Sequence, residues 1–206
     1  TTTTNEGNIF GAAVNQGSLT YKAPAFELPG GVTLNVTADY DPNANVAAPA
    51  PGGVGTDGAS GEAFTVKLAH ESGLTLGGGH MKVGDTAARA GEQAATGYAK
   101  YSNGGLTIGY QEFYYNNHTG GADTDGDGMA IAYTAGDVTI SYSVMNEQTG
   151  AHGATAAKEE EEISAFQAAY SLGGMTLAAS MYETDNVEGV AGTKYEETEL
   201  SVSFAF

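Results

Sequence analysis

The chain has 206 residues, with 25 acidic residues against 7 lysines and arginines, and its net charge at pH 7 is -18. This balance excludes a nucleic-acid-binding protein, because too few cations are present to neutralise phosphates. Cysteine is absent, which excludes disulfide frameworks and thiolate metal sites. The length fits one domain, and the 31 glycines and 12 tyrosines are typical of many short strands joined by turns.

The first part of the chain contains a loop and two predicted strands. Residues 1–15 show neither a helical nor a strand period and are predicted to be a loop. From Gly17 onward hydrophobic and polar residues alternate, first through Tyr21 and then, after the turn PAFELPG, over residues 32–40. A period of two predicts strands with one apolar and one polar face. Residues 41–61 are rich in proline, glycine and alanine and are predicted to be a long loop.

The rest of the chain repeats a tight hairpin followed by a long loop. The predicted tight turns are Ser72-Gly73, Asn103-Gly104, the AGD at residues 135–137, and Gly173-Gly174. The predicted long loops are residues 84–93, 116–127, 148–160 and 184–195. About eleven strands result, without any helix of ordinary length. Because short turns and long loops alternate, all short turns are expected at one end of the sheet.

The last eight residues, ELSVSFAF, have the clearest two-faced pattern. Leu200, Val202, Phe204 and Phe206 share one face, and small or polar residues share the other. Lipid on one side and water on the other require this arrangement, so the sequence predicts an all-β fold, a transmembrane antiparallel up-and-down β-barrel. An odd strand count leaves an open edge, which is costly in lipid. Further strands and a signal peptide are therefore expected upstream of Thr1.

Three segments resemble Gram-negative general diffusion porins, in particular those of marine alphaproteobacteria: residues 18–40, YAKYSNGGLTIGYQ at residues 98–111, and ELSVSFAF. The resemblance implies a sixteen-strand barrel. Residues 1–15 would be the end of its inward-folded constriction loop. Residues 16–206 would be strands six to sixteen, with short periplasmic turns and long extracellular loops.

The resemblance also implies partners and a location. The chain would form a homotrimer in the outer membrane, in contact with lipid and lipopolysaccharide, and would pass ions and small hydrophilic solutes. In that family an aromatic, alternating C-terminal strand closes the barrel and is read by the barrel-assembly machinery. Phe204 and Phe206 are the residues of this chain that match that role.

Three lysines are candidate pore-lining residues. Lys22, Lys67 and Lys100 fall on the polar faces of three strands that run in the same direction. In porins a basic wall opposite an acidic inner loop produces a transverse field at the constriction. By that resemblance Glu6, in the predicted constriction loop, would be the acidic counterpart of Lys22. The alternative is that the three lysines are solvated lumenal residues with no special role.

The segment DTDGDG at residues 123–128 is a candidate calcium site in an outer loop. Asp123, Asp125 and Asp127 place carboxylates at alternate positions, as in the opening of a calcium-binding loop. The twelfth position is Thr134 instead of the expected glutamate, which excludes an EF-hand. A looser calcium site and an acid-rich turn both stay open. No other cofactor is predicted, and the four histidines lack metal-ligand spacing.

The sequence leaves several functions to compare. The preferred hypothesis is a passive channel with weak cation preference, which the net charge of -18 indicates. The acidic run of residues 159–162 is either a solvated segment or, with Asp185 and Glu188, part of a negative outer vestibule. The alternative is a barrel-anchored surface binding or adhesion protein that acts through acidic outer loops. An outer-membrane enzyme is not predicted, because the sequence contains no nucleophile motif. A soluble β-sandwich is the remaining structural alternative.

Overall fold

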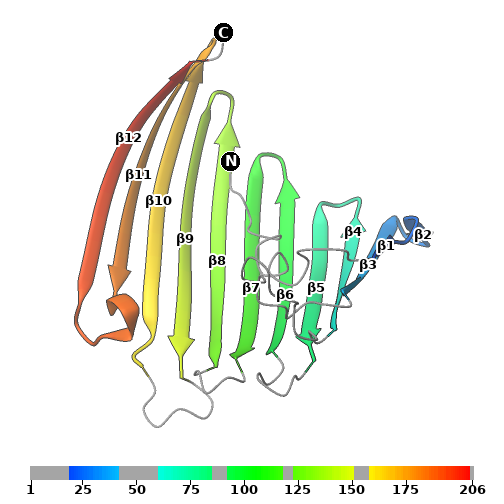
Figure 1. Ribbon diagram of the computed structural model, residues 1–206. Helices are drawn as coiled ribbons and strands as arrows, with labels where there is room; N and C mark the ends of the chain where they lie inside the picture. Colours follow the sequence, from blue (N-terminus) through cyan, green and yellow to red (C-terminus); the bar gives the residue numbers. More distant parts are fainter. Residues whose placement is uncertain (1–18, 42–59, 85–91, 118–122, 151–157, 205–206) are drawn as a thin grey trace, which may run out of the picture.

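The computed structural model describes residues 19–41, 60–84, 92–117, 123–150 and 158–204, which form one antiparallel sheet (Figure 1). Its strands are β1 (Leu19–Lys22), β2 (Phe26–Leu28), β3 (Val32–Asp41), β4 (Gly61–His70), β5 (Leu74–Val83), β6 (Glu92–Asn103), β7 (Leu106–Asn117), β8 (Thr124–Ala135), β9 (Val138–Thr149), β10 (Glu161–Leu172), β11 (Met175–Asp185) and β12 (Lys194–Phe204). A short 3-10 turn, η1 (Val187–Gly189), joins β11 to β12.

The sheet has the up-and-down topology that the alternating pattern predicts. Its order is β1-β3-β4-β5-β6-β7-β8-β9-β10-β11-β12, and every pairing is antiparallel. Figure 1 shows a single curved sheet with β1 and β2 near one edge and β12 at the other. Within the described ranges β1 and β12 are not paired with each other, so the barrel is not closed. No helix in those ranges is long and apolar enough to cross a membrane.

Tight turns gather at one end of the sheet, which we call the turn end, and the long connections at the other, the loop end (Figure 1). Four of the turns are also hydrogen-bonded to the next strand along the sheet or to the residue that directly follows it. The Ser102 amide donates to the Gly73 carbonyl at 3.0 Å, and the Thr134 amide donates to the Gly105 carbonyl at 2.9 Å. The predicted segregation of short turns from long loops is therefore confirmed.

Two segments predicted to be turn or loop are wrong in part, because they contain strand residues. The PAFELPG turn includes β2, which pairs with β3 from Phe26↔Leu34 to Leu28↔Val32. The flanking prolines do not prevent this pairing, because both lie outside the three paired residues and need not donate a hydrogen bond to β3. The predicted loop at residues 116–127 ends earlier, since β8 begins at Thr124 and pairs with β7. Acidic and glycine residues hid the alternation there, although it continues from Asp123 to Gly128.

The register brings large apolar residues of neighbouring strands onto one face of the sheet, which we call the apolar face. One such row contains Ile108, Ile131, Tyr142, Phe166 and Met181. The opposite, polar face carries mostly small and polar side chains, although large apolar ones such as Phe113, Met145 and Ile163 also lie on it toward the loop end. A small buried cluster of Ala63, Met81 and Ala94, with Tyr115 packed against it, lies on the polar face toward the loop end.

Candidate functional site

The apolar face exposes side chains that a water-soluble protein would bury. Ile131 is 45% exposed, Phe166 47% and Met181 57%, and their neighbours in the same rows are similarly exposed. Contiguous apolar surface of this extent, running along the whole sheet, needs a nonaqueous partner. On β9 the band runs from Val138 to Val144, about 20 Å along the strand. These dimensions suit a lipid-facing barrel wall.

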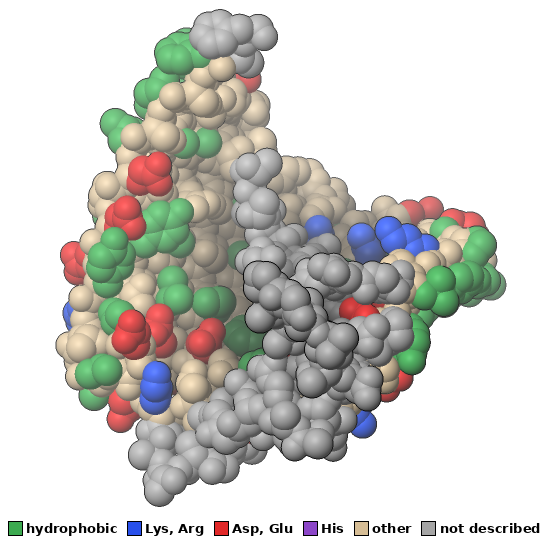
Figure 2. Space-filling model, viewed as in Figure 1, with side chains coloured by type: hydrophobic (Ala, Val, Ile, Leu, Met, Phe, Trp, Pro, Cys, Tyr) green, Lys and Arg blue, Asp and Glu red, His purple; other side chains and the backbone are tan. Residues whose placement is uncertain are grey.

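A row of acidic and amide side chains borders this apolar band at the loop end. We call it the acidic row, and it contains Glu112, Asp127, Asn146, Glu162 and Asp185 in register across β7 to β11. The row directly below it holds Tyr110, Met129 and Val144 on β7 to β9, and Ser164 and Glu183 on β10 and β11. On β7 to β9 the change from apolar to acidic or amide side chains therefore occurs within one step of the register. Figure 2 shows acidic side chains mixed with hydrophobic ones down the left of the view, below a hydrophobic tip.

The polar face carries side-chain hydrogen bonds that run between strands. The Gln111 amide donates to the Thr96 hydroxyl at 2.9 Å, from β7 to β6. The Gln167 amide donates to the Tyr182 hydroxyl at 2.9 Å, from β10 to β11. Polar side chains of this kind can also hydrogen-bond to water. They are therefore compatible with a water-filled space on this side of the sheet.

The structure brings the three predicted lysines onto the polar face. Lys22 pairs with Thr37, Lys67 with Gly77, and Lys100 with Gly109. Their strands β1, β4 and β6 run in the same direction, because each is separated from the next by one antiparallel strand. Lys22 and Lys67 are exposed and Lys100 is half-buried. Their placement matches the prediction, whereas their role in solute passage stays a prediction.

Acidic residues also face the polar side, and the sequence interpretation gave them no pore role. They are Glu27 on β2, Asp39 and Asp41 on β3, Glu92 on β6, Glu147 on β9, Glu161 on β10, and Glu197 and Glu199 on β12. Glu161 accepts a hydrogen bond from the Glu188 amide at 2.6 Å, and Glu197 accepts one from the Tyr195 hydroxyl at 3.0 Å. Extending the alternation backward from Leu200 would have placed Glu197 on this face.

Two of the predicted site residues lie outside the described residues. These are Glu6, the expected acidic counterpart of Lys22, and Phe206, the terminal aromatic. The predicted constriction loop at residues 1–15 lies outside them as well. Phe204 is described: it ends β12 on the apolar face, opposite Met175 at the turn end, and is 60% exposed.

Of the candidate calcium residues, Asp125 and Asp127 lie within strand β8 and not in an outer loop, and Asp123 directly precedes that strand. Asp125 pairs with Tyr114 and Asp127 with Glu112, so both belong to β8 and share the apolar face with Asp123. Alternate residues of a strand are about 6.6 Å apart, so three successive ones span about 13 Å. One calcium ion, with ligands at about 2.4 Å, cannot contact all three. Among the described residues no group of three or more acidic or histidine side chains could hold a metal ion.

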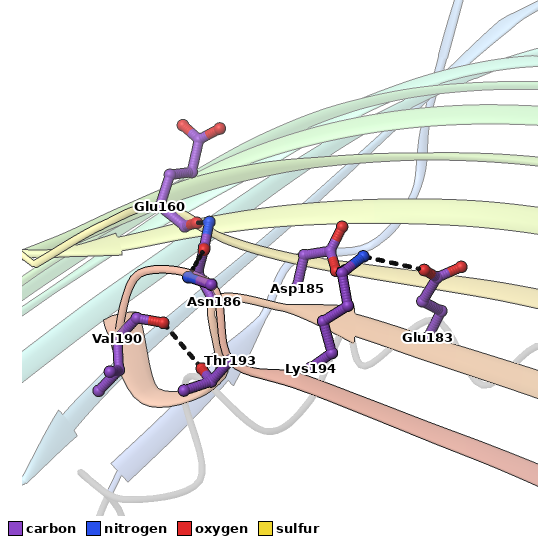
Figure 3. Close-up of polar contacts among 8 residues, drawn as sticks. Glu160, Glu183, Asp185, Asn186, Val190, Thr193 and Lys194 are labelled. Carbon is purple, nitrogen blue, oxygen red and sulfur yellow. Dashed lines mark hydrogen bonds and ion pairs between the residues drawn. The ribbon is translucent and has the colours of Figure 1, made fainter.

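The connection between β11 and β12 forms an ordered clasp, residues 186–193, against the start of β10 (Figure 3). The Asn186 side chain donates to the Glu160 carbonyl at 2.9 Å and accepts from the Gly192 amide at 2.9 Å. The Thr193 hydroxyl donates to the Val190 carbonyl at 2.7 Å. Lys194 then forms ion pairs with Asp185 at 2.7 Å and Glu183 at 3.6 Å. These contacts hold the clasp at the loop end.

The sequence of this two-faced sheet matches a known protein family. A family model described as Gram-negative porin matches residues 1–190. The chain belongs to the Gram-negative porin family. The membership confirms the resemblance seen in the sequence and places this porin in the outer membrane as a β-barrel. Its apolar face is therefore the lipid-facing wall, and its polar face lines the barrel interior.

A solved structure shows the same fold. A Rhodobacter protein, described as porin refined at 1.8 Å resolution, is similar with a TM-score of 0.65 and 17% sequence identity. The match covers 92% of this chain and 61% of that chain, so this porin chain spans about three-fifths of the solved one. No curated protein matched the sequence.

Proposed function

We propose that the complete barrel containing this chain is a passive outer-membrane channel for ions and small hydrophilic solutes. The observation that supports it is the separation of faces across the sheet: large apolar side chains face lipid, and hydroxyls, amides and charges face the interior. A barrel with a polar interior conducts when it encloses water, and pore width and fixed charge then set its selectivity. We propose no catalysis for it.

We propose a weak preference for cations. The interior-facing strand residues include three lysines, on β1, β4 and β6, against eight carboxylates, on β2, β3, β6, β9, β10 and β12. The net charge of the chain, -18, adds a negative potential at the vestibule. A fixed negative charge raises the local concentration of cations and so favours their passage.

Reversing the charge of Lys22 should strengthen the cation preference. In planar bilayers under a potassium chloride gradient, we expect Lys22→Glu to move the reversal potential closer to the equilibrium potential of potassium. The reason is that a basic residue of the lumenal wall is replaced by an acidic one. An unchanged reversal potential would remove Lys22 from the constriction.

Lys82 supplies the matched control for Lys22. Lys82 pairs with Glu62 and Gln93 and shares the apolar face with His80, on the outside of the barrel. Lys82→Glu makes the same change of charge without altering the lumen. The reversal potential of Lys82→Glu should equal that of the unmodified protein, and an equal shift in both variants would contradict the assignment of the two faces.

We further propose the assembly that the family resemblance implies. The complete barrel would have sixteen strands, with residues 1–15 as the end of the constriction loop and Glu6 opposite Lys22. It would form a homotrimer in contact with lipopolysaccharide. β12, ending in Phe204 at the turn end, would pair with the first strand and carry the signal for the barrel-assembly machinery. The unpaired edge of β12 in the described sheet supports this role.

A surface binding protein is the second candidate, and the clasp of residues 186–193 is the observation that favours it. Its hydrogen bonds give the loop end a fixed shape, which recognition of a partner requires. Single-channel conductance separates the two candidates, because a plugged anchor conducts no ions.

A further inference from the structure

One row of the register crosses the polar face near the middle of β6 and contains two glycines. From β4 to β9 the row holds Lys67, Gly77, Tyr98, Gln111, Gly128 and Met145. It therefore includes one of the lysines predicted to line the pore, and it places a large aromatic side chain beside a residue that has none. All of these residues lie on the face that lines the barrel interior.

The side chain of Tyr98 lies across the neighbouring strand β5 and does not stand away from the sheet. A Cβ added to Gly77 of β5 would lie 2.5 Å from Cζ of Tyr98 and 2.6 Å from both Cε1 and the hydroxyl oxygen. The far end of the ring therefore occupies the space that a side chain on Gly77 would fill. Side chains of a strand usually stand roughly perpendicular to the sheet. In that orientation the Tyr98 ring would project into the lumen.

The wall offers the ring no other place nearby. On β5, Thr75 and Gly79 flank Gly77 on the same face, and Gly79 is buried under other atoms. On β7, Gln111 occupies the other side of the ring, and its amide donates to the Thr96 hydroxyl at 2.9 Å. A side chain on Gly77 would therefore move the ring off the wall and into the interior.

A second ring lies over a glycine in the same way, but its surroundings are less favourable for a test. A Cβ on Gly126 of β8 would lie 2.5 Å from Cζ of Phe113 and would also collide with the Asn146 carbonyl. At Gly77 the three nearest atoms all belong to the Tyr98 side chain. Gly77 also lies in a regular strand without a positive φ, so alanine can adopt its backbone conformation.

We propose that Gly77 determines the width of the pore at this level, because it lets the Tyr98 ring lie against the wall. With a side chain on Gly77, the ring would project into the lumen and take space from passing ions and solutes. Pore diameter is one of the properties that decide which solutes pass. Gly77 is thus a positioning residue that acts through Tyr98. The inference rests on the proposed channel function and adds to it a residue that sets the size of the solutes.

Two measurements on the full-length protein test this inference: single-channel conductance in planar bilayers, and the largest neutral sugar that enters proteoliposomes. For Gly77→Ala we expect a conductance lower by roughly a tenth or more and a smaller limiting sugar, because the displaced ring narrows the pore. Gly128→Ala is the matched control, since it adds the same methyl group in the same row. Its nearest neighbour there would be the Val144 carbonyl oxygen at 3.4 Å, an ordinary contact. Its conductance should stay close to that of the unmodified protein.

Removing the ring separates its effect from that of the added methyl group. In the double variant Gly77→Ala with Tyr98→Ala, the conductance should return at least to the value of Gly128→Ala. Equal conductance in Gly77→Ala and Gly128→Ala would overturn the inference, and so would a double variant that conducts as poorly as Gly77→Ala. Failure of Gly77→Ala to fold would overturn it too, because the ring would then be locked in place. An unmodified protein without conductance would contradict the channel itself, whereas a conducting protein with these results contradicts only this inference.

Discussion

Replacing Ile131 with arginine is expected to lower the stability of the folded barrel by about 2–4 kcal/mol, the usual loss for a basic residue near the middle of a lipid-facing band. Ile131 lies on β8 between Ile108 and Tyr142 of the neighbouring strands, and Met129 and Tyr133 flank it along the strand. No described acidic side chain is paired beside it. Urea titration of the protein in lipid vesicles measures the change.

Ala132 gives a control one residue along the same strand. Ala132 pairs with Thr107 and Ser141, which share the polar face. Ala132→Arg therefore adds the same guanidinium to the water-filled side and should change stability by much less than Ile131→Arg. Its additional positive charge should reduce the cation preference of the channel. Equal destabilisation by the two variants would mean that the faces are assigned wrongly.

Substituting asparagine for Gly105 is expected to destabilise the β6–β7 hairpin by about 2 kcal/mol or more, through backbone strain and a lost hydrogen bond. Gly105 has φ 86, and a Cβ there would collide with the Thr134 carbonyl. Moving that part of β8 away would break the bond from the Thr134 amide to the Gly105 carbonyl. The folded fraction after refolding into detergent, read from gel mobility, reports the loss.

Gly104 is the matched control within the same turn. Its φ is 57, in the left-handed region that asparagine tolerates, and nothing lies within 4 Å of its would-be Cβ. Gly104→Asn should therefore fold almost as well as the unmodified protein. If Gly104→Asn and Gly105→Asn were equally damaging, the close approach to Thr134 would not be the cause.

The alternation of residue types predicted most of this fold, because a barrel strand in lipid must separate its two faces at every step. Residues 32–40 and the hairpin from Met129 to Val144 show this directly. The short turns were also predictable, since glycine with φ above zero is needed where two strands reverse within two residues. Because short turns alternate with long loops, the sequence also indicated which end of each strand lies at the turn end and which at the loop end.

The prediction failed where side-chain chemistry hides the period. In β8 the residues Asp125 and Asp127 alternate with glycines, so a two-faced strand was interpreted as a candidate calcium loop. The strand spacing separates these carboxylates too widely for one ion. β2 was not predicted, because a segment of three residues beside prolines is too short to show an alternation of apolar and polar residues.

The charged lining of the interior was only partly predictable. Lys22, Lys67 and Lys100 are surrounded by regular alternation, so their shared face could be deduced. The acidic Glu147 and Glu161 lie near strand ends, where sequence does not reveal how far the pairing continues.

The reversal potential of the full-length protein in a planar bilayer, under a tenfold potassium chloride gradient, tests the proposed cation-preferring channel. We expect stable ionic conductance and a reversal potential of the sign that favours potassium, because the interior-facing and vestibule charges are mainly acidic. A reversal potential of the opposite sign would contradict the proposed selectivity, and the absence of any conductance would contradict the channel itself.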